Sequence, residues 1–483
     1  MTSLLGGGVD RHVRDIARNA RHRHLVWHAG DRAEVMEVSG EERYFPLEGD
    51  AFEHRSAALE RWLRRRRVSI VHAHSVSRAV RARTTWAAEA LGAPTIVTLH
   101  DILFLRREGF EPDAAVGPDP AWLAETAPFL ERAAAVVAPS HYVADLARKH
   151  VPGLQVTIVP NGTPAPAKTA PHLEPRADFV ARRPRHVVAV LGAIGPHKGS
   201  ELLSEISPLL EGSDIAIVVI GYLDRQVVHG WHAPHVFVHG AYAAEDVGAL
   251  LRAYGADLVL FPNPIPESFS YSLSEAWDAG IAAVVPPEGA LAERVSRHGG
   301  GWLLPTGFVG RTVVTVLQRL LAPENSAELA RVKSPLAAPD PERVPRVDSM
   351  TQSLTALYAR FGIDPSEPLD AASPPVQELI AKNLDSTLFR QELVRLAAEL
   401  EKLRVVPEEE RQRSAKTAEE ARRWMAKLEA DIAALQAQLA AEVETRRELG
   451  QENVQLRIHK DAFDLLPMVI RKVLLKKILN ARS

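Results

Sequence analysis

Hydrophobic residues along most of this chain occur in short runs, and the longer segments between the runs carry apolar residues at helical spacing. Short apolar runs bounded by Gly, Pro or Asn predict buried strands, and helical spacing predicts amphipathic helices. The order of strand, helix and strand repeats over residues 68–162 and again over residues 186–305. This order is typical of parallel sheets covered by helices. The pattern therefore predicts an α/β protein with two sheet domains.

The apolar runs place the elements of both domains along the chain. In the first domain we expect strand segments at residues 25–27, 35–38, 68–72, 94–101, 134–141 and 156–162, and helices over residues 9–17, ending at residues 61–67, and over residues 78–91 and 142–150. In the second domain we expect a strand that runs into a glycine-containing loop over residues 186–199, and further strand segments at residues 215–220, 236–240, 257–261 and 281–285. Helices are expected over residues 200–210, 244–254, 269–277 and 347–361.

The last part of the chain has a different pattern. Apolar residues recur at alternating spacings of four and three over residues 389–403 and again over residues 425–456, with Pro407 between the blocks. This spacing predicts a coiled coil over residues 377–460 and is also compatible with a single solvated helix. Residues 461–483 form a basic amphipathic segment that suits an anionic membrane surface or a groove on a partner protein.

Composition narrows the class of protein. The 483 residues carry 58 basic and 61 acidic side chains, a formal charge of −3, so the chain has no general attraction to nucleic acid. Cysteine is absent, which excludes disulfides and thiolate chemistry. No run of about 18 apolar residues and no signal-peptide pattern occurs. We therefore expect a cytoplasmic protein that at most attaches to the inner face of a membrane.

Two glutamates lie in the segment PNPIPESFSYSLSEAWDAG at residues 262–280. Glu267 falls at the mouth of a predicted helix, and Glu275 follows eight residues later, about two turns further along. Both carboxylates are then expected beyond the carboxyl end of a parallel strand, where open α/β sheets bind ligands. Carboxylate oxygens at that place suit a ligand rich in hydroxyl groups. The spacing alone is also compatible with two unrelated glutamates on a solvated helix face.

Two glycine-containing loops precede predicted helices. Gly192, Lys198 and Gly199 follow the first strand of the second domain, and Gly7 and Gly8 precede the first helix of the chain. Backbone N–H groups at a helix N-terminus favour an anion, and a lysine beside them favours a diphosphate. A glycine triplet by itself is also typical of a flexible start, so the first loop leaves both interpretations open.

A histidine and an aspartate end another predicted strand. His100 and Asp101 follow an apolar run of the first domain, at the edge that a parallel sheet offers to catalysis. A structural role for the histidine and a catalytic role both fit this position.

These segments together resemble retaining glycosyltransferases of family 4, which have the GT-B fold of two Rossmann-like domains facing a cleft. The motif P-x-P-E-x-F-x-x-x-L-x-E-A-x-x-x-G at residues 264–280 resembles the E-x7-E motif of that family. A G-G-x-x-x-H-V loop, the A-P-S and P-N-G segments of the first domain and the G-G-W-L-L-x-P segment of the second extend the resemblance over about residues 6–362. The chain is similar in particular to glycosyltransferases of bacterial polysaccharide and O-antigen biosynthesis.

The resemblance implies roles for the candidate residues. Glu267 would contact the donor sugar, Glu275 the ribose of the nucleotide, and Lys198 the diphosphate. The family has an arginine where this chain has Ala193, so another cation is expected in its place. The residues implied in catalysis are His100, Asp101, Lys198 and Glu267, and those implied in donor binding are Gly7, Gly8, Gly192, Lys198, Gly199, Glu267, Ser268, Phe269, Ser270 and Glu275.

The implied reaction moves a sugar from a nucleotide-sugar donor to a surface-polysaccharide or lipid-linked glycan acceptor. No cofactor and no metal are expected, because no D-x-D doublet accompanies the motifs. The alternative is a non-catalytic GT-B assembly protein that acts through its coiled coil. In both cases the coiled coil predicts a homo-oligomer, and the tail a peripheral membrane contact.

The expected domain boundaries follow from these assignments. They are an acceptor-side Rossmann-like domain at residues 1–165, a proline-rich linker at 166–185, a nucleotide-sugar-binding Rossmann-like domain at 186–345, a crossover helix at 346–362, a second proline-rich linker at 363–376, the coiled coil at 377–460 and the basic tail at 461–483.

The first glycine loop begins at residue 6, although a parallel sheet needs a strand that leads into such a loop. Residues 1–5 are too short for a full strand. We therefore expect the natural protein to begin upstream, unless the domain tolerates a shortened strand.

Overall fold

The computed structural model describes residues 8–19, 24–29, 33–38, 41–46, 63–64, 68–106, 117–165, 173–182, 184–223, 229–240 and 242–362, with side chains left out for residues 25–46 and Ala244. These residues belong to one compact unit, Met1–Pro374. None of the helices described is long and apolar enough to cross a membrane. The predicted coiled coil, the basic tail and Gly7 lie outside the described residues, as do residues 1–5, so the expectations for them stay predictions.

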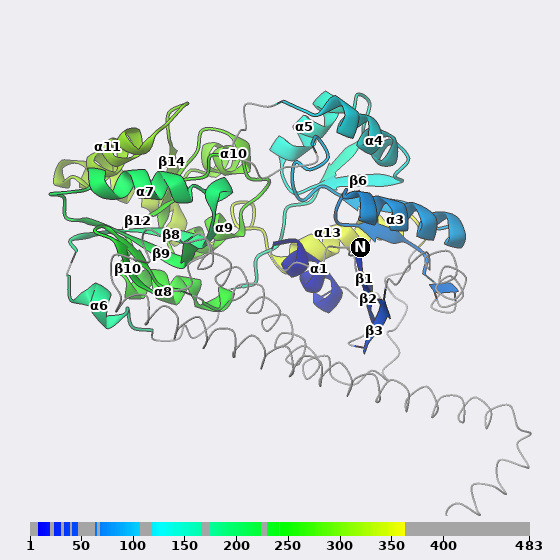
Figure 1. Cartoon of the computed structure of the whole chain (residues 1–483), viewed down its shortest axis with the longest axis horizontal. Coiled ribbons are helices and arrows are strands. Elements are labelled where there is room, and N and C mark those ends of the chain that lie inside the picture. The colour runs from blue at the N-terminus through cyan, green and yellow to red at the C-terminus, as the bar shows by residue number, and fades with distance from the viewer. Residues whose placement is uncertain are drawn as a thin grey trace, which may run out of the picture. The chain divides into compact units, whose positions relative to one another are not determined.

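The second domain is built on a seven-stranded sheet in the order β10-β11-β9-β8-β12-β13-β14 (Figure 1). All neighbours pair in parallel except β10 and β11, which are antiparallel. The strands are β8 His186–Ile194, β9 Ile215–Leu223, β10 Gly230–Ala233, β11 Val236–Val238, β12 Leu258–Leu260, β13 Ala282–Val285 and β14 Gly301–Leu303. The helices are η1 Pro196–Lys198, α7 Ser200–Leu209, η2 Ala244–Asp246, α8 Val247–Ala253, α9 Tyr271–Asp278, α10 Gly289–His298, α11 Gly310–Leu321, η3 Pro323–Asn325, α12 Ser326–Lys333 and η4 Ser334–Ala337.

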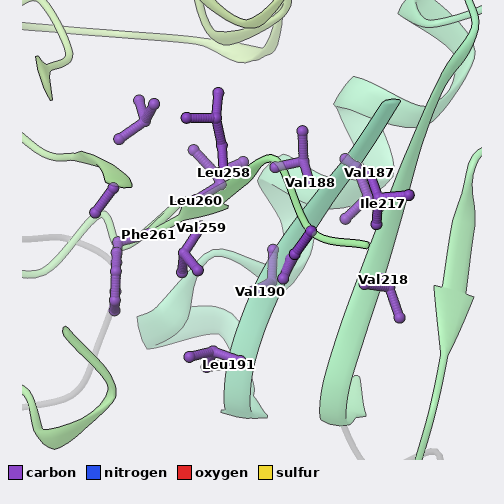
Figure 2. Packing of buried hydrophobic residues seen from close by; sticks show 14 of the residues in the cluster. Val187, Val188, Val190, Leu191, Ile217, Val218, Leu258, Val259, Leu260 and Phe261 are labelled. Carbon is purple, nitrogen blue, oxygen red and sulfur yellow. The ribbon is translucent and has the colours of Figure 1, made fainter. Parts of the chain in front are cut away.

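Helices on both faces of this sheet explain why its strands read as continuous apolar runs. Figure 2 shows Val188 and Val190 of β8, Ile217 of β9 and Val259 of β12 within one core, and all four are buried. A strand buried on both faces has no solvent side, so its sequence does not alternate between apolar and polar residues. The predicted α/β character of the domain is confirmed.

The first domain contains a smaller parallel sheet in the order β4-β5-β6-β7. Its strands are β4 Val71–Ala73, β5 Thr95–Thr98, β6 Ala135–Ala138 and β7 Val156–Ile158, and its helices are α1 Gly8–Asn19, α3 Arg78–Leu91, α4 Pro120–Glu131 and α5 His141–His150. Helix α3 has the bounds that the hydrophobic pattern predicts. Its ends are set by the side chain of Ser77, which accepts a hydrogen bond from the N–H of Val80, and by Gly92 in the left-handed region.

The strands predicted at residues 25–27 and 35–38 are present, but their pairing differs from that of a parallel sheet. Residues 25–46 form a separate antiparallel sheet of β1 Leu25–Ala29, β2 Ala33–Val38 and β3 Glu41–Pro46, and do not pair with the parallel sheet. The reason lies in the connections, because two or three residues between strands allow a hairpin, whereas a parallel crossover needs a dozen residues or more. In the described part of the chain, β4 is therefore at an edge of its sheet.

The predicted linker over residues 166–185 also differs in part. Residues Ala177–Val180 form the short helix α6, and Phe179 is buried in the core of the second domain. Just before the helix, Arg176 donates a hydrogen bond to the carbonyl oxygen of His239 at 2.8 Å. The prolines of this segment flank residues 177–180 without interrupting them, which leaves room for one helical turn.

The final described helix, α13 Val347–Ala359, returns to the first domain. Its buried residues Met350 and Leu354 share a small core with Ile16 of α1. The start of the helix lies against Gly162, where an added Cβ would come within 2.4 Å of the Val347 Cα atom. This close approach requires glycine, and it explains the P-N-G segment without any ligand.

Candidate functional site

The candidate site lies where loops after strands of both domains meet. The loop between β12 and α9 belongs to the second domain, and the end of β5 belongs to the first. The hydroxyl of Ser268 donates a short hydrogen bond to the carbonyl oxygen of His100, which joins these two loops. The carboxyl ends of parallel strands are the expected place for a ligand site in this class of fold.

Glu267 sits beside a cation and two further donors. Its Oε1 atom lies 3.4 Å from Nζ of Lys198 and accepts a hydrogen bond from Nδ2 of Asn263 at 2.7 Å. Burial opposes the charge of Glu267, but Lys198 and the hydrogen bonds from Ser270, Lys198 and Asn263 hold the pKa of this carboxyl below its ordinary value. The carboxylate is therefore ionised at neutral pH.

The loop that carries Glu267 has an unusual backbone. Among the described non-glycine residues, Ser270 has a positive φ, 72°. Such a conformation costs free energy in a residue with a Cβ, and it persists only where surrounding contacts enforce it. Here the guanidinium of Arg294 donates hydrogen bonds to the carbonyl oxygens of Phe269 and Ser270, at 3.1 and 2.8 Å. Arg294 thus holds the loop in shape, and sequence reasoning did not assign it a role.

Arg294 is itself buried. Its guanidinium also donates to the hydroxyl of Ser274 and stacks over the ring of Phe269, 4.4 Å from the ring centroid. Burial lowers the pKa of Arg294 to about 9, so the side chain still carries its charge at neutral pH. Phe269 is buried as well, so its side chain supports the loop instead of facing a ligand.

The Lys198 loop packs directly on the Glu267 loop. Gly199 has φ 88°, and an added Cβ there would lie 2.1 Å from the carbonyl oxygen of Pro262. Gly192 has φ 108°, and its carbonyl oxygen would lie 2.0 Å from a Cβ added at Gly221 of β9. The glycines therefore let the loops and strands touch, which brings Lys198 to Glu267.

Glu275 projects from α9 and meets a residue of the first domain. Its Oε1 atom lies 2.6 Å from Nη1 of Arg11 on α1, and the Arg11 guanidinium is 4.4 Å from the ring centroid of Tyr271. Gly8 opens α1, and a Cβ added there would touch the ring of Tyr271 at 3.5 Å. The sequence contained both ends of the Arg11–Glu275 contact, but their separation of 264 residues hid it.

Four histidines of the first domain form the histidine cluster: His12, His72, His74 and His100. Nδ1 of His74 lies 3.0 Å from Nε2 of His100, and the ring of His12 lies 4.5 Å from that of His100. His72 hydrogen-bonds Tyr358 and Thr98, each at 2.8 Å. The buried ring of His12 has the side chain of Asn161 as a polar neighbour.

Burial keeps this cluster neutral. It lowers the pKa of His12 to about 3 and holds those of the other three well below the ordinary value. Burial also raises the pKa of Asp101 to about 6, against the hydrogen bond that its carboxylate accepts from the N–H of Leu103 at 2.9 Å. Asp101 thus closes the turn after β5, while His100 enters the cluster.

The cluster also has the geometry of a metal-binding group. One ring nitrogen from each of His12, His74 and His100 lies within 4.8 Å of the others. Neutral imidazoles are the form that binds zinc and similar ions. These three residues are the ones in the described part of the chain that could hold a metal ion.

A cavity of about 570 Å³ opens beside these loops, between the two domains. Ile102, Leu105 and Tyr142 line it from the first domain, and Gly199 and Asn263 from the second. Neither Glu267 nor Glu275 lines this cavity. It therefore provides space for a second ligand next to the carboxylates.

Comparison with known families covers both domains. The family described as Glycosyltransferase Family 4 matches residues 6–165, and the family described as Glycosyl transferases group 1 matches residues 174–330. Together the two matches cover more than half of the chain.

A curated relative of this chain is also a glycosyltransferase. The lipopolysaccharide 1,2-N-acetylglucosaminetransferase of Salmonella typhimurium is 26% identical over 215 residues, which are 41% of this chain and 55% of that protein. The chain therefore spans about half the length of this curated relative.

Solved structures show the same fold. The Anabaena protein HepE in complex with UDP matches with a TM-score of 0.55 and 18% identity, over 74% of this chain and 98% of that one. Sucrose-phosphate synthase from Thermosynechococcus elongatus matches with a TM-score of 0.50 and 15% identity, over 74% and 94% of the two chains. At these identities the likeness establishes the architecture of the chain.

Proposed function

Because this chain belongs to the GT-B glycosyltransferases, we propose that it is a retaining enzyme that transfers a sugar from a nucleotide sugar to a surface-polysaccharide or lipid-linked glycan. The observation that carries the proposal is the contact between Lys198 and Glu267 at 3.4 Å. It places a cation and an ionised carboxylate side by side on one preformed loop surface.

The reaction explains why both charges are needed. Breaking the bond between a sugar and a diphosphate builds positive charge on the anomeric carbon and negative charge on the leaving diphosphate. Lys198 and the N–H groups at the start of α7 stabilise the diphosphate, and Glu267 holds a hydroxyl of the transferred sugar. The binding of Glu275 to the ribose completes the donor site.

The cavity of about 570 Å³ beside the donor loops is the proposed place for the acceptor. The HepE complexes contain UDP, and the Salmonella relative acts on lipopolysaccharide, so a uridine nucleotide is the first donor to test and a glycan the first acceptor. His100 would act from the histidine cluster, and its carbonyl oxygen accepts a hydrogen bond from Ser268 of the donor loop. Asp101 acts indirectly, by shaping the turn that follows His100.

We propose further that turnover needs no metal, since Lys198 supplies the positive charge beside the leaving group. Transfer activity is then unchanged by EDTA. A chelator-sensitive activity that zinc restores, and that His74→Ala abolishes, would assign a metal to the histidine cluster and contradict this part of the proposal.

The deciding experiment has two stages. Calorimetry with UDP, GDP, ADP and CDP and their common sugar conjugates identifies the donor, and a transfer or hydrolysis assay with that donor measures turnover. We expect both binding and turnover. Binding without turnover, with every tested glycan acceptor, would mean that the protein is a non-catalytic platform.

The proposal also includes the two segments that follow residue 376, which lie outside the described residues. The pattern over residues 377–460 predicts an oligomer, and the basic segment at residues 461–483 predicts binding to an anionic membrane surface. Both features would hold the enzyme near a lipid-linked acceptor.

A further inference from the structure

Each carboxylate of the candidate donor site is already paired with a cation. Glu267 lies 3.4 Å from Lys198, which belongs to the same domain, and Glu275 lies 2.6 Å from Arg11, which belongs to the other domain. The two ion pairs differ in whether a ligand must break a contact between the domains to reach the cation. Lys198 can contact an anion without leaving its loop, whereas Arg11 can be released only by breaking a contact between domains.

The Arg11–Glu275 pair is well shielded from water. The two side chains are 24% and 10% exposed, and the Tyr271 ring covers the guanidinium on one side. Asp15 lies one turn along α1, with a carboxylate oxygen 3.9 Å from Nε of Arg11. A guanidinium in such a place has several alternative directions for its donors, because it carries five N–H groups in a planar fork.

The pair also competes with the function proposed for Glu275. A carboxylate bound to a guanidinium at 2.6 Å has one oxygen committed and its charge neutralised. Two ribose hydroxyls would have to share the acceptor sites that remain on the same carboxylate. A nucleoside diphosphate resolves this conflict, because it brings hydroxyl donors for the carboxylate and an anion for the guanidinium.

The Lys198 loop leaves room for a second cation. Ala193 of β8 has no charge, although it lies just after Gly192 and close to the loop that carries Lys198. A diphosphate carries more negative charge than one lysine neutralises. Arg11 is the cation that the structure holds against the opposite carboxylate of the same site.

We propose that Arg11 is a donor-binding residue that changes partners. When the nucleotide binds, its guanidinium turns from Glu275 to the diphosphate, and Glu275 accepts hydrogen bonds from the ribose hydroxyls. One ion pair is replaced by a charge-assisted contact to phosphate and by hydroxyl-to-carboxylate hydrogen bonds, so no buried charge is left unpaired. This inference rests on the proposed function, since it assumes a nucleoside diphosphate as the ligand.

The partner exchange gives the diphosphate a role in closing the site. Arg11 comes from α1 of the first domain, and Lys198 from the second. A diphosphate held by both cations bridges the domains, whereas a nucleoside without phosphates contacts only the second. The ratio of the affinity for a nucleoside diphosphate to the affinity for the nucleoside therefore measures the contact between Arg11 and the diphosphate.

The test compares UDP and uridine in calorimetry on the full chain; GDP and guanosine, ADP and adenosine, or CDP and cytidine replace them if UDP does not bind. Arg11→Ala is expected to weaken UDP binding at least tenfold and to change uridine binding less than threefold. Arg11→Lys is expected to fall in between, because an ammonium cannot reproduce the bidentate contact. Arg14→Ala is the matched control, since Arg14 lies on the same helix and pairs with Asp10 at 2.8 Å.

A second variant changes the other member of the Arg11–Glu275 pair. Glu275→Gln removes the charge that holds Arg11, so uridine binding is expected to weaken more than UDP binding. Equal losses for UDP and uridine in Arg11→Ala, or unchanged UDP binding, would overturn the partner exchange while leaving the glycosyltransferase assignment intact. If the unaltered chain binds none of these diphosphates, the proposed donor class fails together with this inference. Thermal unfolding of each variant shows whether a loss reflects the contact or the fold.

Discussion

The two sides of the candidate site carry different kinds of polar group. The second domain supplies the charged groups Glu267, Glu275 and Lys198. The first supplies the charged Arg11 and the neutral rings of the histidine cluster. The charged side lies on loops whose shape is set by glycine contacts and by Arg294. The histidine cluster draws one ring from α1 and the others from β4 and the residues that follow β4 and β5, and these rings pack against one another. A charged surface suits the diphosphate and the hydroxyls of a donor, whereas neutral imidazoles suit an uncharged acceptor hydroxyl.

The difference has an electrostatic origin. Burial lowers the pKa of every histidine in the cluster, because no described carboxylate lies close enough to compensate for lost hydration. Burial also opposes the charge of Glu267, but Lys198 together with the hydrogen bonds from Ser270 and Asn263 outweighs it and lowers the pKa. The same cost of desolvation therefore leads to neutral groups on one side and to ion pairs on the other.

The largest effect is expected from removing the cation on the charged side. Lys198→Ala should lower kcat about 10²- to 10³-fold, because a preorganised charge at the leaving group is lost. Lys198→Arg should recover only part of the rate. The control is Lys149→Ala, at an exposed lysine of α5. Normal turnover by the Lys198→Ala variant would remove Lys198 from the diphosphate.

Substitutions of the two carboxylates should affect different quantities, the turnover rate for Glu267 and the affinity for the donor for Glu275. Loss of a hydrogen bond to a charged group costs roughly 1.5–3 kcal/mol. We expect Glu267→Ala to lower kcat and Glu275→Ala to weaken donor binding, each by that amount, in steady-state kinetics and calorimetry. The exposed Glu211→Ala serves as control. Unchanged donor affinity in the Glu275 variant would contradict its assignment to the ribose.

The buried neutral histidines of the cluster should make the free energy of unfolding depend on pH. The folded pKa of each cluster histidine is below 6.5, so the unfolded chain binds more protons below pH 6.5 and stability falls as the pH drops. Each histidine contributes up to about 1.4 kcal/mol per pH unit. Asp101 has the opposite sign, since its pKa of about 6 favours the folded state at lower pH, but it is one group against four.

Urea unfolding between pH 5 and 7.5 measures this slope. His12→Asn should flatten it, whereas substitution of His235, which lies in the second domain and bonds the carbonyl oxygen of Ile215, should not. A stability that does not change over this range would show that the cluster is not kept neutral.

The smallest effect on the site is expected from removing the rest of the chain. A protein that ends at Gly362 should bind its donor within about twofold of the full chain, because both domains and α13 are retained. Light scattering should show an oligomer for the full chain and a monomer for the shortened one. A full-length monomer at micromolar concentration would contradict the predicted coiled coil.

Local patterns in the sequence predicted much of the fold and half of the site. Helix α3, the buried strands β8 and β9, and the loop with Glu267 follow from hydrophobic runs, caps and turn residues that act within a few positions. The antiparallel pairing of β1, β2 and β3 was missed, although the short connections between these segments are a local signal for it. The turn of helix at Ala177–Val180 was hidden by the prolines around it.

The other half of the site depends on contacts between distant residues. His12 and His100 lie far apart in the sequence, and nothing in the spacing of histidines along the chain brings their rings to 4.5 Å. His72 of β4 and His74, which follows directly after that strand, were the available signal, since residues two positions apart in extended backbone share a face. The positive φ of Ser270 is likewise unpredictable, because a serine adopts it only under the contacts of Arg294.

By itself, the sequence determined that this chain has two α/β domains, where its carboxylates and its loop lysine stand, and which family it resembles. These properties depend on periodicity, on glycine and proline, and on motifs shorter than one strand–helix unit. Only the tertiary structure decided that Arg11 holds Glu275 and that the histidines cluster and stay neutral. Burial and charge pairing depend on which surfaces meet, and that is set by the packing of whole domains.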